Sequence, residues 1–231
     1  MNRFFERFSR YPPMECKTRR TDLLQASFPF GLGEVLPLEV LKNHHGEGHV
    51  AAVIYKKDGD KILVQIVKQR YVDKQQVPRI LVKFPGGGIK PEKDANAFDA
   101  LQRETLEEIG LRLCWSRLCG VLKITEKDQH IKYFVLVDGN GFSDNNRSDI
   151  VDPEILDYKW EDVANIFSCQ PINFPDDNPG ERKKFFHSKH LWPLVVLFSE
   201  SRVRRLVSAV SQWLHYYPEA CGELFREYLR K

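Results

Sequence analysis

The sequence feature that most constrains the fold is a run of three glycines placed shortly before a strongly acidic segment. Residues 80–88 read ILVKFPGGG, and residues 103–110 read RETLEEIG. Glycine has no side chain, so the main chain at residues 86–88 can come close to a ligand. The pattern predicts a short strand, a glycine-rich turn and then a helix from about Asp94 to Ile109. We expect Asp94 itself to lie before or at the helix start, where an aspartate can serve as an N-cap.

Three glutamates share one side of this predicted helix. At about 100° per residue, Glu104, Glu107 and Glu108 fall within an arc of about 100° at the border of the apolar stripe. Like charges this close repel one another, and the helix dipole disfavours them in the last turns. A cation removes both penalties, and magnesium or manganese prefers oxygen ligands of this kind. The alternative interpretation is a solvated acidic face.

Residues 86–111, GGGIKPEKDANAFDALQRETLEEIGL, resemble the signature of the Nudix hydrolases. Two features depart from that signature: the spacing from Gly88 to Arg103 is one residue longer, and Asp94 or Glu92 stands in for the early glutamate. We place the extra residue in the loop before the helix, where an insertion costs little. The residues that match in register are Gly88, Arg103, Glu104, Glu107, Glu108, Gly110 and Leu111.

The resemblance implies an α/β (α+β) fold, a Nudix-type α/β/α sandwich with a mixed sheet. It implies hydrolysis of a nucleoside diphosphate linked to another group, with magnesium or manganese held by Glu104, Glu107 and Glu108. The Gly88 carbonyl is expected to complete the oxygen ligands. Arg103 is expected to orient a carboxylate, so Arg103 and the three glutamates form the expected catalytic set. The general base stays open among Glu108, Asp149, Asp152 and Glu154.

The stretch before the glycines bears on the substrate. VKQRY at residues 67–71, followed by ILVKFPGG, resembles the ADP-ribose and nucleotide-sugar hydrolases, which places Gln69 and Arg70 near the substrate. The alternative is that Arg70 simply ends a strand at the surface. Lys83 stands where that group usually has an acid, and its proline-glycine loop after the signature is missing. ADP-ribose or a nucleotide sugar is favoured, with dinucleoside polyphosphates and capped RNA as alternatives. A Nudix-fold nucleotide sensor without turnover is an alternative of a different class, motivated by the altered spacing.

Charge and composition limit the expected partners. The net charge is only +3, which argues against a nucleic-acid groove. The small nucleotide-derived substrate is what the resemblance implies. The longest apolar run, near residues 191–198, contains Pro193 and is shorter than the roughly 20 residues of a membrane span. Five cysteines without CxxC spacing predict reduced thiols and a cytoplasmic location. The oligomeric state is left open.

We expect an N-terminal arm at 1–48, a Nudix hydrolase domain at 49–186 and a helical C-terminal addition at 187–231 packed on the core. Within the domain, HVAAVIYKK (49–57) and KILVQIVKQR (61–70) predict a hairpin. We interpret His44, His45 and His49 as surface polar residues in preference to a metal site or a base. His187 and His190 approach the site only if the C-terminal helices fold over it.

Overall fold

The computed structural model describes residues 26–28, 31–72, 76–126, 129–142, 152–167 and 171–175, and residues 177, 184, 186, 187, 190, 193 and 194. Three expectations lie outside these residues: most of the N-terminal arm, most of the helical C-terminal addition, and Asp149 as the general base. In the described part of the chain, no helix is both long and apolar enough to cross a membrane.

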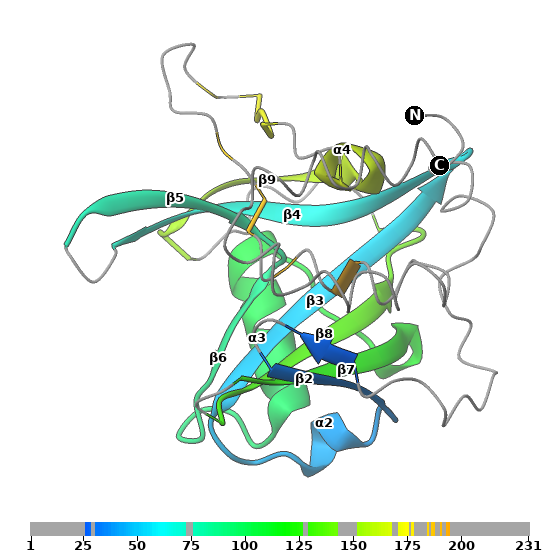
Figure 1. Cartoon of the computed structure of the whole chain (residues 1–231), viewed down its shortest axis with the longest axis vertical. Helices are drawn as coiled ribbons and strands as arrows, with labels where there is room; N and C mark the ends of the chain where they lie inside the picture. Colours follow the sequence, from blue (N-terminus) through cyan, green and yellow to red (C-terminus); the bar gives the residue numbers. More distant parts are fainter. Residues whose placement is uncertain are drawn as a thin grey trace.

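Strands are the main secondary structure of the described residues (Figure 1). They are β1 (Ala26–Phe28), β2 (Gly31–Leu36), β3 (Gly48–Asp58), β4 (Lys61–Val72), β5 (Pro78–Lys83), β6 (Gly86–Ile89), β7 (Leu118–Glu126), β8 (Ile131–Asp138) and β9 (Ile155–Asp162). The helices are α2 (Val40–Asn43), α3 (Ala97–Ile109) and α4 (Val163–Phe167), with a 3-10 turn at Trp115–Arg117.

The strands form one mixed sheet in the order β1-β2-β7-β8-β3-β4-β5, with β6 paired to β3 and β9 paired to β4. Strands β3 and β8 run parallel, and the other pairs of named strands are antiparallel. Strand β3 pairs with β4 only near their connecting turn, so its first residues are free to pair with β6 (Figure 1). The predicted fold class, a mixed sheet with flanking helices, is confirmed.

The predicted hairpin is confirmed as β3 and β4. Its register runs from Tyr55 opposite Val64 to Asp58 opposite Lys61. Gly59 in the turn has φ +57°, a left-handed conformation that glycine adopts without steric cost. The hairpin continues into strand centres in which residues of both faces are buried.

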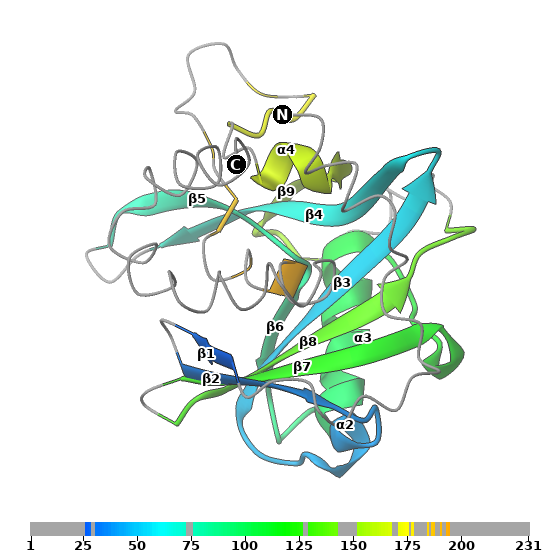
Figure 2. The same ribbon diagram turned by 45° about the vertical axis from the view of Figure 1, so that its right-hand side comes forward.

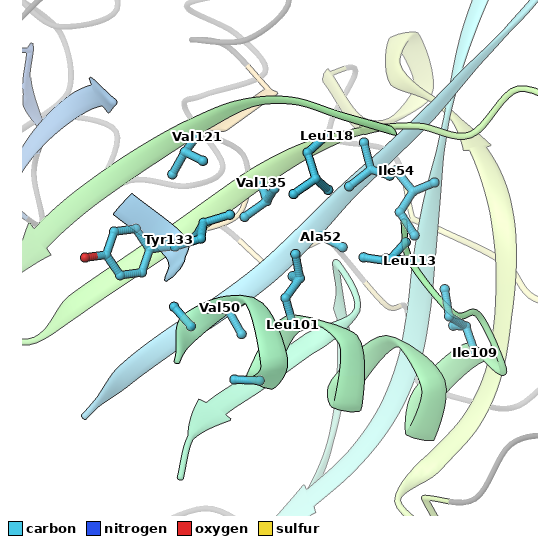
Figure 3. Packing of buried hydrophobic residues seen from close by; sticks show 14 of the residues in the cluster. Val50, Ala52, Ile54, Leu101, Ile109, Leu113, Leu118, Val121, Tyr133 and Val135 are labelled. Atoms are coloured by element: carbon cyan, nitrogen blue, oxygen red, sulfur yellow. The ribbon is translucent and has the colours of Figure 1, made fainter. Parts of the chain in front are cut away.

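Helix α3 covers one face of the sheet. Leu101 and Ile109 of the helix lie in one buried cluster with residues of β3 and β8 (Figure 3), among them Val50, Ala52, Ile54, Tyr133 and Val135.

On the other face, Phe134 alternates with these residues along β8 and therefore points away from α3. The His190 ring lies between Phe134 and Phe84, with centroids 5.2 and 5.5 Å away. The helical residues Pro193 and Leu194 lie across β3 from α3 (Figure 2), and both are buried. Both faces of the sheet are thus covered near the start of β3.

Helix α3 begins three residues later than predicted and ends where predicted. Its N-cap is Asn96, whose side-chain oxygen accepts hydrogen bonds from the amides of Phe98 (2.9 Å) and Asp99 (3.0 Å). Gly110 ends the helix with φ +67°, and its amide bonds the Leu106 carbonyl at 3.1 Å. The N-cap assignment of Asp94 is therefore wrong.

Candidate functional site

The glycine run forms strand β6, and its prediction as a turn is wrong. Gly86 to Gly88 pair antiparallel with Ala51 to His49 of β3. Gly86 has φ +147°, and a side chain there would overlap the backbone of Val50 and Ala51. The sequence suggested a loop because glycine clusters usually mark turns. Here the missing side chains allow close backbone packing within a strand instead.

Each of the three glycines meets a different residue of the acidic segment. The Gly86 amide donates a hydrogen bond to Oε2 of Glu108 at 2.6 Å. A Cβ on Gly87 would overlap the carboxylate of Glu104. The Gly88 carbonyl accepts a hydrogen bond from Nη2 of Arg103 at 3.0 Å. Strand β6 therefore contacts, and helps to position, the side chains of Arg103, Glu104 and Glu108 on α3.

Arg103 joins three carboxylates. Its Nε and Nη2 bond the two oxygens of Asp94, both at 2.8 Å, in a bidentate pair. Its Nη1 bonds Glu104 at 2.6 Å and Glu107 at 3.1 Å. The hydrogen bond to Asp94, and then the hydrogen bond and charge of Glu104, raise the pKa of Arg103 above its ordinary value, against the opposing effect of burial. This guanidinium therefore brings Glu104 and Glu107 together, and the resemblance implied such a contact with one signature carboxylate.

Asp94 belongs to the site, although the sequence placed it about a helix-length away from Glu104. Its side chain is buried, and it accepts a hydrogen bond from the Lys90 amide at 2.8 Å as well as those from Arg103. Burial opposes its ionisation, but the hydrogen bonds from Arg103 and Lys90 outweigh burial and lower the pKa of Asp94. Glu92 is exposed. Of the two acids considered in this loop, Asp94 is therefore the one that is bonded to Arg103.

The three glutamates differ sharply in exposure. The side chain of Glu107 is 38% exposed, against 9% for Glu104 and 2% for Glu108. Glu107 is also tied through its carbonyl to the amide of Asp152 at 3.0 Å. Glu107 is therefore the carboxylate of the three that a dissolved ion or ligand meets first.

Glu108 has a cation of its own. Lys83, the last residue of β5, donates from Nζ to Oε1 of Glu108 at 2.8 Å and to the Gly86 carbonyl. Burial of Glu108 raises its pKa to about 7, against the opposing effects of Lys83 and the Gly86 amide. The sequence showed Lys83 as a departure from the usual acid at this place, but gave no sign that it pairs with Glu108.

The predicted three-glutamate metal site fits only in part. Glu104 and Glu107 both accept hydrogen bonds from Nη1 of Arg103. Their carboxylates offer the oxygen ligands that magnesium or manganese prefers. Both oxygens of Glu108 are engaged by Lys83 and Gly86, and the Gly88 carbonyl is engaged by Arg103. Among the described residues, no three Asp, Glu, His or Cys side chains gather around one point as ligands. Residues that fit an ion are therefore Glu104 and Glu107.

The other candidate residues form a hydrogen-bonded path that leads to Glu107. The Gln69 side-chain amide donates to Glu154 at 3.0 Å, and the backbone amide of Arg70 donates to the Glu154 carbonyl at 2.8 Å. The Glu154 amide donates to Oδ1 of Asp152 at 2.8 Å. Asp152 in turn bonds the backbone of Glu107. The side chain of Arg70 is exposed on β4.

His187 and His190 are neighbours, with ring centroids 5.4 Å apart. His44 contacts the Glu47 carbonyl, and His45 contacts the Ala95 carbonyl. His49 is partly buried on β3, and within the described residues its Nδ1 has no hydrogen-bond partner. His190 is buried and accepts from the Phe84 amide at 3.1 Å, so it supports the sheet opposite α3.

A comparison with protein families matches the NUDIX domain over residues 47–187. The chain belongs to this family. The matched range contains the glycine strand, helix α3 and the path from Gln69 to Glu107.

Solved structures similar to this NUDIX protein share little of its sequence. A MutT/nudix family protein from Enterococcus faecalis is 15% identical with a TM-score of 0.46, and the match covers 72% of this chain and 65% of that one. A C. elegans Ap4A hydrolase complex is 20% identical with a TM-score of 0.36, covering 50% and 80%. The NUDIX domain of Shewanella oneidensis NrtR, complexed with ADP ribose, is 17% identical with a TM-score of 0.34, covering 51% and 73%.

The glycine strand gives a first testable prediction. Gly87→Ala is expected to push the Glu104 carboxylate from its place and lower activity by about 10- to 100-fold, the effect typical of displaced supporting groups. Stability is expected to fall little, because the overlapping atoms are the end of a flexible side chain. Steady-state kinetics and thermal unfolding of the same samples measure both effects.

Gly88→Ala is the matched control, because the nearest heavy atom to a Cβ there lies 4.0 Å away. It should retain near-normal activity. Equal loss in Gly87→Ala and Gly88→Ala would contradict the docking role of Gly87.

His49 gives a second prediction, on the pH dependence of stability. Burial, followed by the charges of Lys83 and Lys132, lowers the pKa of His49 to about 3. Below pH 6.5 the unfolded chain binds a proton at this position that the folded chain does not, so stability is lost as the pH falls. At pH 5 the loss from His49 is about 2 kcal/mol relative to pH 7.5.

We therefore expect His49→Gln to reduce the loss of unfolding free energy between pH 7.5 and pH 5 by about 2 kcal/mol. Urea unfolding at the two pH values measures it. His45→Asn, at an exposed neighbour, is the control. A His49→Gln protein with the same pH dependence as the parent would show that His49 is protonated in the folded state.

Proposed function

We propose that this NUDIX protein hydrolyses a pyrophosphate bond in a nucleoside diphosphate linked to another group, using magnesium or manganese. The observation that carries the proposal is the Arg103 network, which draws Glu104 and Glu107 to one guanidinium nitrogen and leaves Glu107 open to solvent. A solvated acidic face would not need a bidentate pair with a buried aspartate to hold it in place.

The ion would be held by Glu104 and Glu107. When bound, it would offset the charge on the phosphates and lower the pKa of the attacking water. The chain's own residues fix the geometry: Arg103 holds both carboxylates, and Gly87 leaves room for that of Glu104. Arginine suits this task because its planar fork serves several acceptors at once, which lysine cannot do.

The reaction adds water across the bond between the two phosphates. The water oxygen bonds one phosphorus atom, the bridging P–O bond breaks, and the leaving phosphate takes the electron pair. A base must accept the proton of the water. Among the described residues, Asp152 and Glu154 are candidates for this base, since their hydrogen bonds connect them to Glu107 and Gln69. Glu108 is less suited, because both its oxygens are engaged.

For the substrate, we favour ADP-ribose or a nucleotide sugar. The resemblance of residues 67–87 to that group supports this, and so does the position of Gln69 on the path to Glu107. The substrate is a small nucleotide derivative in this proposal, with dinucleoside polyphosphates and capped RNA as the alternatives within the reaction class. A cytoplasmic location stays a prediction.

A nucleotide sensor without turnover is the second candidate, and one observation favours it. Lys83 neutralises Glu108, one of the three carboxylates expected to bind metal. A site with fewer free carboxylates is better suited to holding a nucleotide than to activating water.

Product analysis separates the two candidates. ADP-ribose, a nucleotide sugar, a dinucleoside polyphosphate and a cap analogue are incubated with magnesium, with manganese or with EDTA, and the products are resolved by ion-exchange chromatography. We expect ADP-ribose to give AMP and ribose 5-phosphate with either metal, and no product with EDTA. Binding detected by calorimetry, with no product from any compound, would favour the sensor and exclude the hydrolase.

A further inference from the structure

The pair formed by Lys83 and Glu108 is among the least exposed ion pairs of the described residues. The two side chains are 6% and 2% exposed. Lys83 contacts the Glu108 carboxylate and the Gly86 carbonyl, and Glu108 uses its second oxygen for the Gly86 amide. The ammonium group therefore lies between two oxygen atoms that α3 and β6 bring together.

Those two oxygens are of the kind that divalent cations use. A carboxylate and a backbone carbonyl are hard ligands, and calcium, magnesium and manganese sites are built from them. An ammonium group donates hydrogen bonds to the same oxygens as a compact positive charge. Lys83 thus supplies, from within the chain, the positive charge that a divalent ion would bring to Glu108 and Gly86.

The fold holds Lys83 in this place. Its neighbours in the chain, Val82 and Phe84, are buried, and the Phe84 amide is bonded to His190 on the opposite face. An ion that displaced the ammonium would leave a positive charge stripped of its partners in a buried position, which is strongly unfavourable. An ion added beside the ammonium would meet its repulsion.

We infer that Lys83 is a built-in cation that takes the place of a divalent ion at Glu108 and Gly86, so that, of the three glutamates of α3, Glu104 and Glu107 remain to hold a metal ion. The inference rests on the proposed function in one respect, namely that Glu104 and Glu107 hold the metal ion. It assigns to Lys83 a positioning role for Glu108 and a limit on the number of metal ions that the site accepts.

Binding of manganese in the absence of nucleotide tests the inference. The free-ion signal in electron paramagnetic resonance gives the number of sites and their Kd for the parent chain, Glu107→Gln, Glu108→Gln, Lys83→Gln and the double variant Lys83→Gln/Glu108→Gln. Glutamine at 83 can still donate to Glu108, and glutamine at 108 can still accept from Lys83, so both replacements keep the shape of the pair. Circular dichroism confirms that each variant is folded.

We expect Glu108→Gln to bind manganese as the parent does, within about twofold in Kd, and Glu107→Gln to bind it at least about tenfold more weakly. Lys83→Gln is expected to gain one site or to bind at least about tenfold more tightly, and the double variant to lose that gain.

Two results would overturn the inference: Glu108→Gln weakening manganese binding as much as Glu107→Gln does, or Lys83→Gln binding as the parent does. If Lys83→Gln does not fold, the comparison of Glu108→Gln with Glu107→Gln still decides. These readouts are independent of turnover. If the parent chain binds no manganese and cleaves no compound, the proposed hydrolase fails, while a site gained in Lys83→Gln and lost in the double variant still supports the built-in cation.

Discussion

Glu107→Gln is expected to lower kcat/KM by about 100-fold or more, because it removes one of the two carboxylates left to hold the divalent ion. The free energy of unfolding should change by less than about 0.5 kcal/mol, since the side chain is partly exposed and its loss also relieves repulsion with Glu104. Kinetics at saturating magnesium and urea unfolding provide the two measurements.

The matched control is Glu92→Gln, which removes the same charge from an exposed position in the loop before α3. It should retain the parent activity. If Glu107→Gln were as active as Glu92→Gln at saturating magnesium, Glu107 would not be a metal ligand, and the assignment of the ion to α3 would be wrong.

Arg103→Gln is expected to have the largest effect on stability. It leaves the buried carboxylate of Asp94 without its bidentate partner, and it frees Glu104 and Glu107 to repel each other. Breaking a buried ion pair by removing one partner costs about 3 to 5 kcal/mol, and the partial exposure of Arg103 places the expected loss near the lower end. Activity should fall as well, by at least about tenfold, because the two carboxylates lose their common support.

Urea unfolding of Arg103→Gln beside Arg112→Gln, a change at an exposed arginine just after α3, separates this network from a general loss of charge. The second variant should be nearly as stable as the parent. A loss in Arg103→Gln no larger than in Arg112→Gln would show that the Arg103 network does not stabilise the fold.

Much of the fold was predictable because its signals are local. The β3–β4 hairpin follows from two apolar stretches around a glycine turn, and the end of α3 follows from Gly110. Thr105 stands where the signature is usually aliphatic, and it fits because the side chain is buried with its hydroxyl bonded to the Leu101 carbonyl. These features depend on residues close together in the chain.

The errors concern residues whose partners lie far away in the sequence. The glycine run is a strand because β3 pairs with it, and no local pattern shows that pairing. Asp94 was assigned to the helix start because it is polar and precedes the apolar repeat, whereas its partner is the side chain of Arg103 on the helix. Two other residues of the loop, Ala95 and Asn96, separate it from the helix, and the cap falls to Asn96.

The sequence indicated which residues make up the candidate site, but it did not show which of them pair with one another. The helical spacing correctly placed the glutamates on neighbouring positions, and it could not show that one of them is buried against β5. Lys83 was visible only as a departure from the resemblance. Its partnership with Glu108 arises because β5 and β6 are joined at Phe84 and Pro85, which brings the lysine alongside the glycine strand. That pair engages one of the three glutamates, and the proposed function assigns the ion to the other two.

Hydrolysis in water enriched in oxygen-18 tests the central claim most directly. The folded protein is incubated with ADP-ribose and magnesium in labelled water. Glu107→Gln and a sample with EDTA are treated in the same way, and mass spectrometry measures the masses of the products. The account predicts two phosphate monoesters, of which one carries a single oxygen-18 atom, with formation abolished by EDTA and strongly reduced in Glu107→Gln. The account would be contradicted if the parent protein with magnesium left ADP-ribose and the other nucleotide compounds of the panel uncleaved and without oxygen-18.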